Sequence, residues 1–144
     1  MLDQNCAYCM KGELVAKFGY FCIELESSNV YVFKEQSHPG RVIVAHKKHV
    51  SEMVELTDEE RNQYFKDINT VAKAIHEVYN PDKINYGAYG DTGHHLHFHL
   101  VPKYKDEYEW GGVFLMNPGI KNINEEECEV IAAKLASAIK KLNK

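Results

Sequence analysis

The stretch 94–102, which reads HHLHFHLVP, restricts the fold of this chain more than any other segment. Three histidines, His95, His97 and His99, alternate there with large apolar residues. Such alternation has the period of a β-strand, whose successive side chains point to opposite faces. We therefore predict a strand that turns its apolar residues toward the core and gathers the three imidazoles on the other face.

The rest of the chain predicts short strands and two amphipathic helices. Thr57 and Glu60 form a capping box for a long helix that stops at Asn80, and Asn124 caps a final helix. Aromatic and β-branched runs predict strands at 18–25, 30–33, 41–45 and 84–89. A turn at 90–93 should join the last of these to the histidine strand as a hairpin. The pattern indicates an α+β fold, one antiparallel sheet with helices packed on it, in a single domain spanning 1–144.

The charge balance limits the partners that the chain can have. Lys plus Arg is 17 and Asp plus Glu is 21, which gives a formal net charge of −4. A surface for a nucleic-acid polymer usually needs a basic excess, whereas a small phosphate ligand needs only a few local donors. No apolar run is as long as a membrane span. We therefore expect a cytoplasmic protein that binds neither nucleic-acid polymers nor membranes.

Cys6 and Cys9 form a C-x-x-C pair near the start of the chain. Two thiolates at this spacing can bind one zinc ion from a tight turn, and a structural site then needs two further ligands. His49 is a possible third ligand if the strand before it returns to this pair. A redox pair would follow a strand, which is not predicted here. Zinc binding is the preferred interpretation, and two half-buried cysteines without a ligand remain the alternative.

Three imidazoles on one strand face fit two kinds of chemistry. They can hold a catalytic zinc ion that keeps one open position for water. Alternatively, one neutral imidazole attacks phosphorus while its neighbours orient it and handle charge. An unperturbed pKa of about 6.5 leaves histidine neutral and nucleophilic near pH 7. A third possibility, from another class, is a regulatory nucleotide-binding protein with little turnover.

The run His-Leu-His-Phe-His-Leu-Val at 95–101 resembles the motif of the histidine triad (HIT) superfamily of nucleotide hydrolases and transferases. Residues 39–49 resemble the Pro-Gly-His strand of that family and its basic end, and the C-x-x-C pair resembles the knuckle of its zinc-containing bacterial members. The resemblance implies the HIT-like fold and a homodimer formed through the long helix and a neighbouring strand. Candidate contacts for the dimer are Tyr64, Phe65 and Ile68.

The resemblance also implies a role for each histidine. His97 would attack the α-phosphorus of a nucleotide, break a P–N or P–O–P bond and form a covalent nucleotidyl-histidine intermediate. His99 would hydrogen-bond the phosphate or the leaving group, and His95 would support the site. The implied cofactor is a structural zinc ion, with no organic cofactor. The zinc ligands would be Cys6, Cys9, His49 and His95.

One position departs from the family pattern. Many members have a fourth histidine after the Pro-Gly turn, and Arg41 stands there in this chain. We hypothesise that Arg41 supplies a fixed positive charge to the phosphate, and the alternative is a surface arginine at a strand start. Tyr89 and His99 are the other candidates for substrate binding. The resemblance also implies that the segment 110–118 reaches the site of a second subunit.

Overall fold

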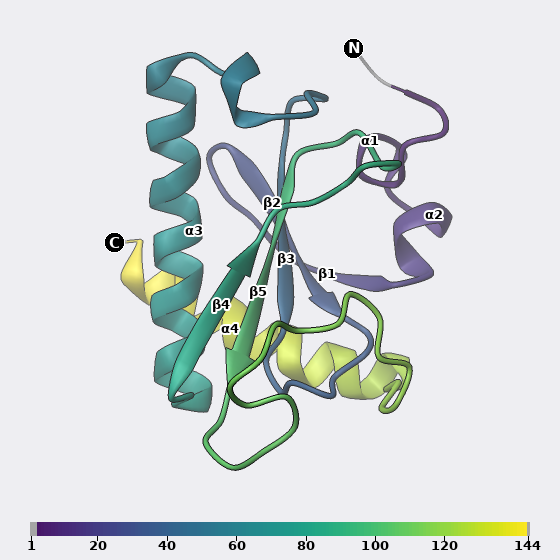
Figure 1. Cartoon of the computed structure of the whole chain (residues 1–144). Coiled ribbons are helices and arrows are strands. Elements are labelled where there is room, and N and C mark those ends of the chain that lie inside the picture. The colour runs from purple at the N-terminus through teal and green to yellow at the C-terminus, as the bar shows by residue number, and fades with distance from the viewer. Residues whose placement is uncertain (1–2, 144) are drawn as a thin grey trace.

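The computed structural model describes residues 3–143 and contains one five-stranded antiparallel sheet in the order β1-β2-β3-β5-β4 (Figure 1). This confirms the predicted α+β fold. The strands are β1 (Gly19–Glu24), β2 (Ser28–Phe33), β3 (Val42–His46), β4 (Lys83–Gly87) and β5 (His97–Lys103). The helices are α1 (Ala7–Met10), α2 (Glu13–Ala16), the 3-10 helix η1 (Met53–Glu55), α3 (Asp58–Tyr79) and α4 (Glu125–Leu142).

The two faces of the sheet carry different groups of helices. The long helices α3 and α4 cover one face and form the main hydrophobic core with it. The short helices α1 and α2 lie against the other face, where a smaller cluster includes Tyr31, Phe33 and Ile43. Among the described helices, none combines the length and the apolarity that a membrane span needs.

Strand β5 lies between β3 and β4 and is buried along its whole length. Phe98 and Leu100 point into the main core, as the alternation predicts. His97 and His99 therefore point to the face that α1 and α2 approach. Their partners across the strand pair are Ala45 and Ile43 of β3, so both imidazoles stand near the middle of the sheet.

The predicted hairpin between β4 and β5 is wrong in its detail. Strand β4 ends at Gly87 and β5 begins at His97, so a longer connection, 88–96, replaces the turn at 90–93. The backbone N–H of Leu96 donates to the carbonyl of Val50 at 2.7 Å, and the Leu96 carbonyl accepts from His46. The backbone at Leu96 therefore pairs with the last residue of β3 and with Val50 beyond it, and makes no ladder with β4.

Helix α3 is tied to the sheet by two polar contacts from its buried side. The Tyr64 hydroxyl donates to the Val44 carbonyl at 2.7 Å. The Asp67 carboxylate accepts from the N–H and hydroxyl of Ser27 and from the hydroxyl of Ser28, at 3.0, 2.8 and 2.7 Å. Asp67 thus fixes the β1–β2 turn to the helix. Tyr64 lies in the core of its own chain, and of the dimer candidates only Phe65 is exposed.

Substituting Asp67→Ala tests this tie. The change leaves buried donors of the β1–β2 turn without an acceptor, so we expect the free energy of unfolding to fall by about 3 kcal/mol. Urea denaturation followed by circular dichroism measures the loss. The exposed neighbour Lys66→Ala is the matched control and should change stability by about 0.5 kcal/mol or less. Equal effects of the two substitutions would contradict the assignment.

Candidate active site

His97 has one nitrogen that is committed to the protein and one that is free to react. Its Nδ1 lies 2.7 Å from the backbone carbonyl of His95. A carbonyl only accepts, so Nδ1 carries the proton and Nε2 keeps its lone pair. Burial lowers the pKa of His97, and the ring is therefore neutral at pH 7. His97 is arranged as a nucleophile through Nε2.

The side chain of His97 borders a cavity of about 410 Å³, a volume within the usual range of ligand sites. The Tyr8 ring of α1 stands over the imidazole, with 4.9 Å between ring centroids and 37° between planes. Phe18 and the turn residues Thr92 and Gly93 form other parts of the wall. Helix α1 thus covers His97 and leaves space for a small ligand beside it.

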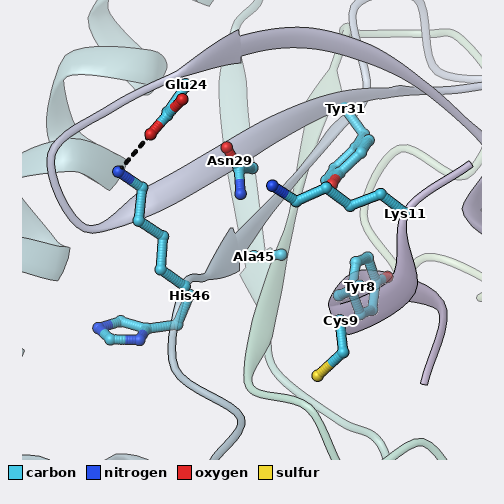
Figure 2. A pocket seen from close by; sticks show the side chains of 9 residues that line it. Tyr8, Cys9, Lys11, Glu24, Asn29, Tyr31, Ala45 and His46 are labelled. Carbon is cyan, nitrogen blue, oxygen red and sulfur yellow. Dashed lines mark hydrogen bonds and ion pairs between the residues drawn. The ribbon is translucent and has the colours of Figure 1, made fainter. Parts of the chain in front are cut away.

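A smaller cavity of about 230 Å³ also has Tyr8 in its wall (Figure 2). The side chains of Lys11, Asn29 and Tyr31 line it, and the buried Tyr31 hydroxyl finds no hydrogen-bond partner among the described residues. Tyr8 borders both cavities.

His99 is in the opposite tautomeric arrangement to His97. Arg41 Nη2 lies 3.0 Å from His99 Nδ1 and donates to it. The imidazole is buried between the rings of Phe33 and Phe114, at centroid distances of 5.3 and 6.2 Å. Burial first, and then the charge of Arg41, lower the pKa of His99 to about 3. His99 is therefore a neutral group at physiological pH.

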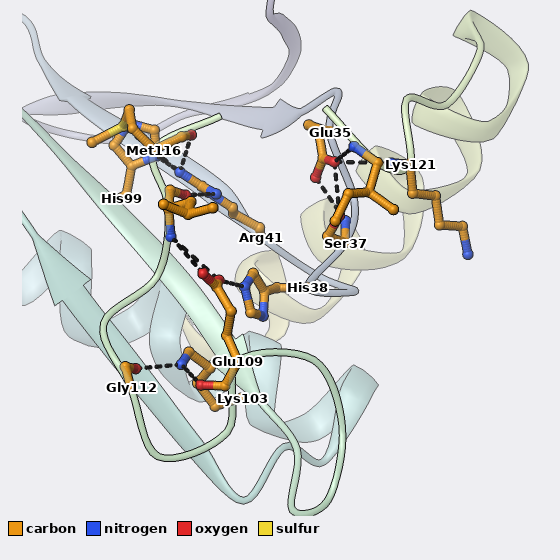
Figure 3. A network of polar contacts seen from close by, with 12 residues as sticks. Glu35, Ser37, His38, Arg41, His99, Lys103, Glu109, Gly112, Met116 and Lys121 are labelled. Atoms are coloured by element: carbon orange, nitrogen blue, oxygen red, sulfur yellow. Dashed lines mark hydrogen bonds and ion pairs between the residues drawn. The ribbon is translucent and has the colours of Figure 1, made fainter. Parts of the chain in front are cut away.

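Arg41 is completely buried, so the alternative of a surface arginine is wrong. Its Nη1 donates to the Leu115 carbonyl at 3.1 Å and its Nη2 to the Met116 carbonyl at 2.8 Å (Figure 3). The guanidinium also lies over the ring of Phe33, 4.2 Å from its centroid. Burial lowers the pKa of Arg41 to about 10, which still leaves the group charged at pH 7.

The segment 104–121, which we call the strap, folds back over Arg41 and His99 (Figure 3). Glu109 holds it together, since its carboxylate accepts from His38 Nε2 at 2.7 Å and from the Leu115 N–H at 3.1 Å. Lys103 Nζ donates to the carbonyls of Glu109 and Gly112, both at 2.7 Å. The strap is thereby fixed to the end of β5 and to the turn before β3.

Sequence reasoning missed most of the residues that hold the strap. That the segment 110–118 reaches the site of a second subunit stays a prediction, and within the chain the carbonyls of Leu115 and Met116 accept from Arg41. Glu35 fixes the far end by accepting from the N–H groups of Ile120 and Lys121. No local pattern marks these contacts, because each joins residues distant in the sequence.

Cys6, Cys9, His49 and His95 come together beside the triad as one cluster. His95 Nδ1 lies 3.4 Å from Cys6 Sγ, 3.5 Å from Cys9 Sγ and 3.2 Å from His49 Nδ1. Zinc bonds of ordinary length would place the ligand atoms of a tetrahedron about 3.3–3.8 Å apart. The spacing of the four side chains therefore suits a tetrahedral metal ion, and the predicted ligand set is spatially consistent.

Both ring nitrogens of His95 already have partners within the protein. Its Nε2 lies 2.5 Å from the backbone carbonyl of His46 and so carries the proton, which directs the Nδ1 lone pair toward the two thiols. Neither nitrogen is free to join His97 and His99 around a single ion. The geometry thus disfavours the alternative in which the triad itself holds a catalytic zinc ion.

Tyr89, the remaining candidate for substrate binding, is not brought into contact with the triad. Tyr89 is 54% exposed, and its ring packs edge-to-face with that of Phe114, with 6.2 Å between the ring centroids. It lines a different cavity, together with Gly90 and His94.

Comparison with known proteins identifies the family. The model of the HIT domain matches residues 21–106. This chain belongs to the HIT family. Among curated relatives, the adenosine 5'-monophosphoramidase of Schizosaccharomyces pombe is 28% identical over 142 residues, which cover 94% of this chain and 99% of that protein. The bis(5'-adenosyl)-triphosphatase of Dictyostelium discoideum is 29% identical over 76 residues, 49% of this chain and 51% of that protein.

Solved structures show the same fold. A zinc-bound histidine triad family protein from Mycobacterium smegmatis superposes with a TM-score of 0.68 at 19% identity, covering 96% of this chain and 95% of that one. The HIT-like fold of this chain is therefore supported both by its sequence and by its structure.

Substituting Glu109→Ala should loosen the strap while leaving the sheet folded. Without the Glu109 carboxylate, His38 and the Leu115 N–H lose their hydrogen-bond acceptor. We therefore expect the equilibrium constant for local opening of 109–116 to rise about 30-fold. Hydrogen exchange read by mass spectrometry measures this opening peptide by peptide. Glu107→Ala, an exposed carboxylate of the same strap, is the control. Unchanged exchange in the Glu109 variant would show that the strap is held by other contacts.

Proposed function

We propose that this chain is a hydrolase or nucleotidyl transferase that breaks a P–N or P–O–P bond at the α-phosphate of a nucleotide, with His97 as the nucleophile. The observation that carries the proposal is the hydrogen bond from His97 Nδ1 to the His95 carbonyl, which directs the Nε2 lone pair away from the backbone. The relatives named as a phosphoramidase and a triphosphatase support a nucleotide as substrate.

The reaction needs two displacements at phosphorus. In the first, His97 Nε2 forms a bond to the α-phosphorus, and the leaving group departs with the electron pair of the bond that breaks. The ring becomes positively charged while Nδ1 keeps its proton, and the His95 carbonyl stabilises that charge. In the second, a water oxygen bonds to phosphorus, the P–N bond breaks, and its electron pair returns to Nε2. The water proton passes to solvent and the nucleoside monophosphate is released.

The other site residues have supporting roles in this proposal. His99 stands beside the nucleophile, with 5.5 Å between the ring centroids, and hydrogen-bonds the phosphate or the leaving group through Nε2. His95 supports the site, because its carbonyl orients His97. It stays a prediction that Arg41 contacts the phosphate directly and that Tyr89 contacts the substrate. A homodimer also stays a prediction, with Phe65 as its exposed candidate on α3.

Substituting His97→Ala should remove the covalent intermediate and lower turnover on the order of 10⁴-fold, since no other group takes over the attack. The test is a rapid alkaline denaturing quench with a panel of adenosine, guanosine and cytidine phosphoramidates and polyphosphates, followed by intact mass and peptide mapping. His76→Ala, an exposed histidine of α3, is the control and should keep both adduct and turnover. A wild-type protein that turns over the panel with no adduct on His97 would refute the mechanism.

We further propose that the cluster of Cys6, Cys9, His49 and His95 holds a structural zinc ion. Two thiolates and two imidazoles form a ligand set typical of tetrahedral structural sites. With zinc bound, the ion would supply a fixed link between the start of the chain and the residues before β5. The zinc-bound relative from Mycobacterium smegmatis supports the choice of metal. No step of the proposed reaction uses the ion.

Zinc analysis of variants separates this site from a catalytic metal in the triad. Wild-type protein should contain about one zinc ion per chain, and Cys6→Ser should lose most of it because one of four ligands is gone. His97→Ala should keep its zinc. Cys22→Ser is the matched control, since Cys22 donates to the Ala132 carbonyl instead. Zinc that disappears with His97 but not with Cys6 would reverse the assignment.

A further inference from the structure

The contact between Arg41 and His99 determines where the proton of His99 lies. A guanidinium has only donors, so the 3.0 Å contact from Arg41 Nη2 is a hydrogen bond only if His99 Nδ1 keeps its lone pair. The single proton of the neutral ring then resides on Nε2. His97, two residues earlier on the same face, has its proton on Nδ1 instead.

The surroundings of Arg41 prevent His99 from taking a second proton. Protonation of Nδ1 would break the bond from Arg41 and place two cations in contact inside the protein. The guanidinium cannot move aside without losing its bonds to the carbonyls of Leu115 and Met116. The low pKa of His99 agrees with this geometry. His99 can therefore donate a hydrogen bond but has no proton to give away at neutral pH.

Because His99 has no proton to give away, it cannot act as an acid toward the leaving group. When a P–O–P bond breaks, the electron pair goes to the bridging oxygen, which departs as a phosphate oxyanion and needs no proton. When a P–N bond breaks, the pair goes to nitrogen, and an amine departs readily only if an acid protonates it. An acid positioned for such a step contributes typically about 10²–10⁴-fold to the rate.

We infer that Arg41 is a positioning residue that fixes His99 as a neutral donor through Nε2, and that the site therefore prefers nucleoside polyphosphates, whose leaving group is an oxyanion, to nucleoside phosphoramidates. The inference rests on the proposed function and specifies its substrate class. In this inference Arg41 acts on catalysis through His99, and the strap carbonyls hold Arg41 in place.

One other imidazole outside the metal cluster borders the cavity beside His97. This is His94, an exposed residue of the turn before β5. If His94 donated a proton to an amine, phosphoramidates would be cleaved in spite of the state of His99. The experiment therefore includes His94→Asn.

The first measurement does not depend on activity. Long-range ¹H–¹⁵N correlation spectra of the zinc-loaded full chain report the tautomer of each histidine. We expect a protonated Nε2 and an unprotonated Nδ1 for His99 at pH 7. Arg41→Met removes the donor and should allow the other tautomer or the imidazolium, whereas Arg41→Lys should partly restore the wild-type signal. A wild-type His99 that is protonated on Nδ1 overturns the inference, even if the variants do not fold.

The second measurement compares two substrates with one nucleoside, diadenosine triphosphate and adenosine 5'-phosphoramidate. Wild-type kcat/KM should be about 10²-fold higher for the triphosphate. In Arg41→Met this ratio should fall, because His99 can then become an acid. Equal or faster cleavage of the phosphoramidate overturns the inference, and its selective loss in His94→Asn would identify His94 as the acid.

The two measurements distinguish the failure of this inference from that of the proposed function. If both substrates form an adduct on His97 but the phosphoramidate is preferred, the proposed function stands and the substrate class is wrong. If no compound of the panel, these two substrates included, modifies His97 or is turned over, both are wrong as statements about catalysis. The tautomer of His99 still decides in that case whether Arg41 positions the imidazole.

Discussion

A neutral imidazole has one nitrogen that donates and one that accepts, and the site depends on how its three histidines divide these roles. Backbone carbonyls accept hydrogen bonds from His95 Nε2 and His97 Nδ1, and so keep the proton of each ring on that nitrogen. Arg41 donates to His99 Nδ1 and leaves the proton of that ring on Nε2. Side chains that look equivalent in the sequence thus present a lone pair directed at two thiols, a lone pair at Nε2 of His97 and a hydrogen-bond donor at Nε2 of His99.

The start of the chain is structurally linked to this arrangement through α1. A helix as short as Ala7–Met10 has little stability of its own. Tyr8 packs it against Phe18 and Tyr31, and the thiols on either side of Tyr8 face His49 and His95. The ring that covers His97 is therefore held by the same short segment that supplies the two cysteines of the cluster.

Much of the fold follows from patterns within short windows of the sequence. The alternation in β5 and the capping box at Thr57 predict a strand and a helix that the structure confirms. The connection 88–96 and the strap could not be predicted in this way, because several of the hydrogen bonds that fix them join distant segments. His38 and Glu109, for example, meet across 71 residues of sequence. Arg41 could be singled out as a departure from the family pattern, but its partners became visible only in the folded chain.

The strongest contacts that the strap makes with Arg41 are two main-chain carbonyls, beside weaker ones from the Met116 sulfur and the Phe114 ring, and this has a consequence for how the protein can change. The side chains of Leu115 and Met116 are 56% and 40% exposed, while their carbonyl groups face the guanidinium. Carbonyl acceptors are present whatever residue occupies these positions. Sequence drift or design can therefore alter the outer surface of the protein at this edge of the site while the acceptors that orient Arg41 are retained.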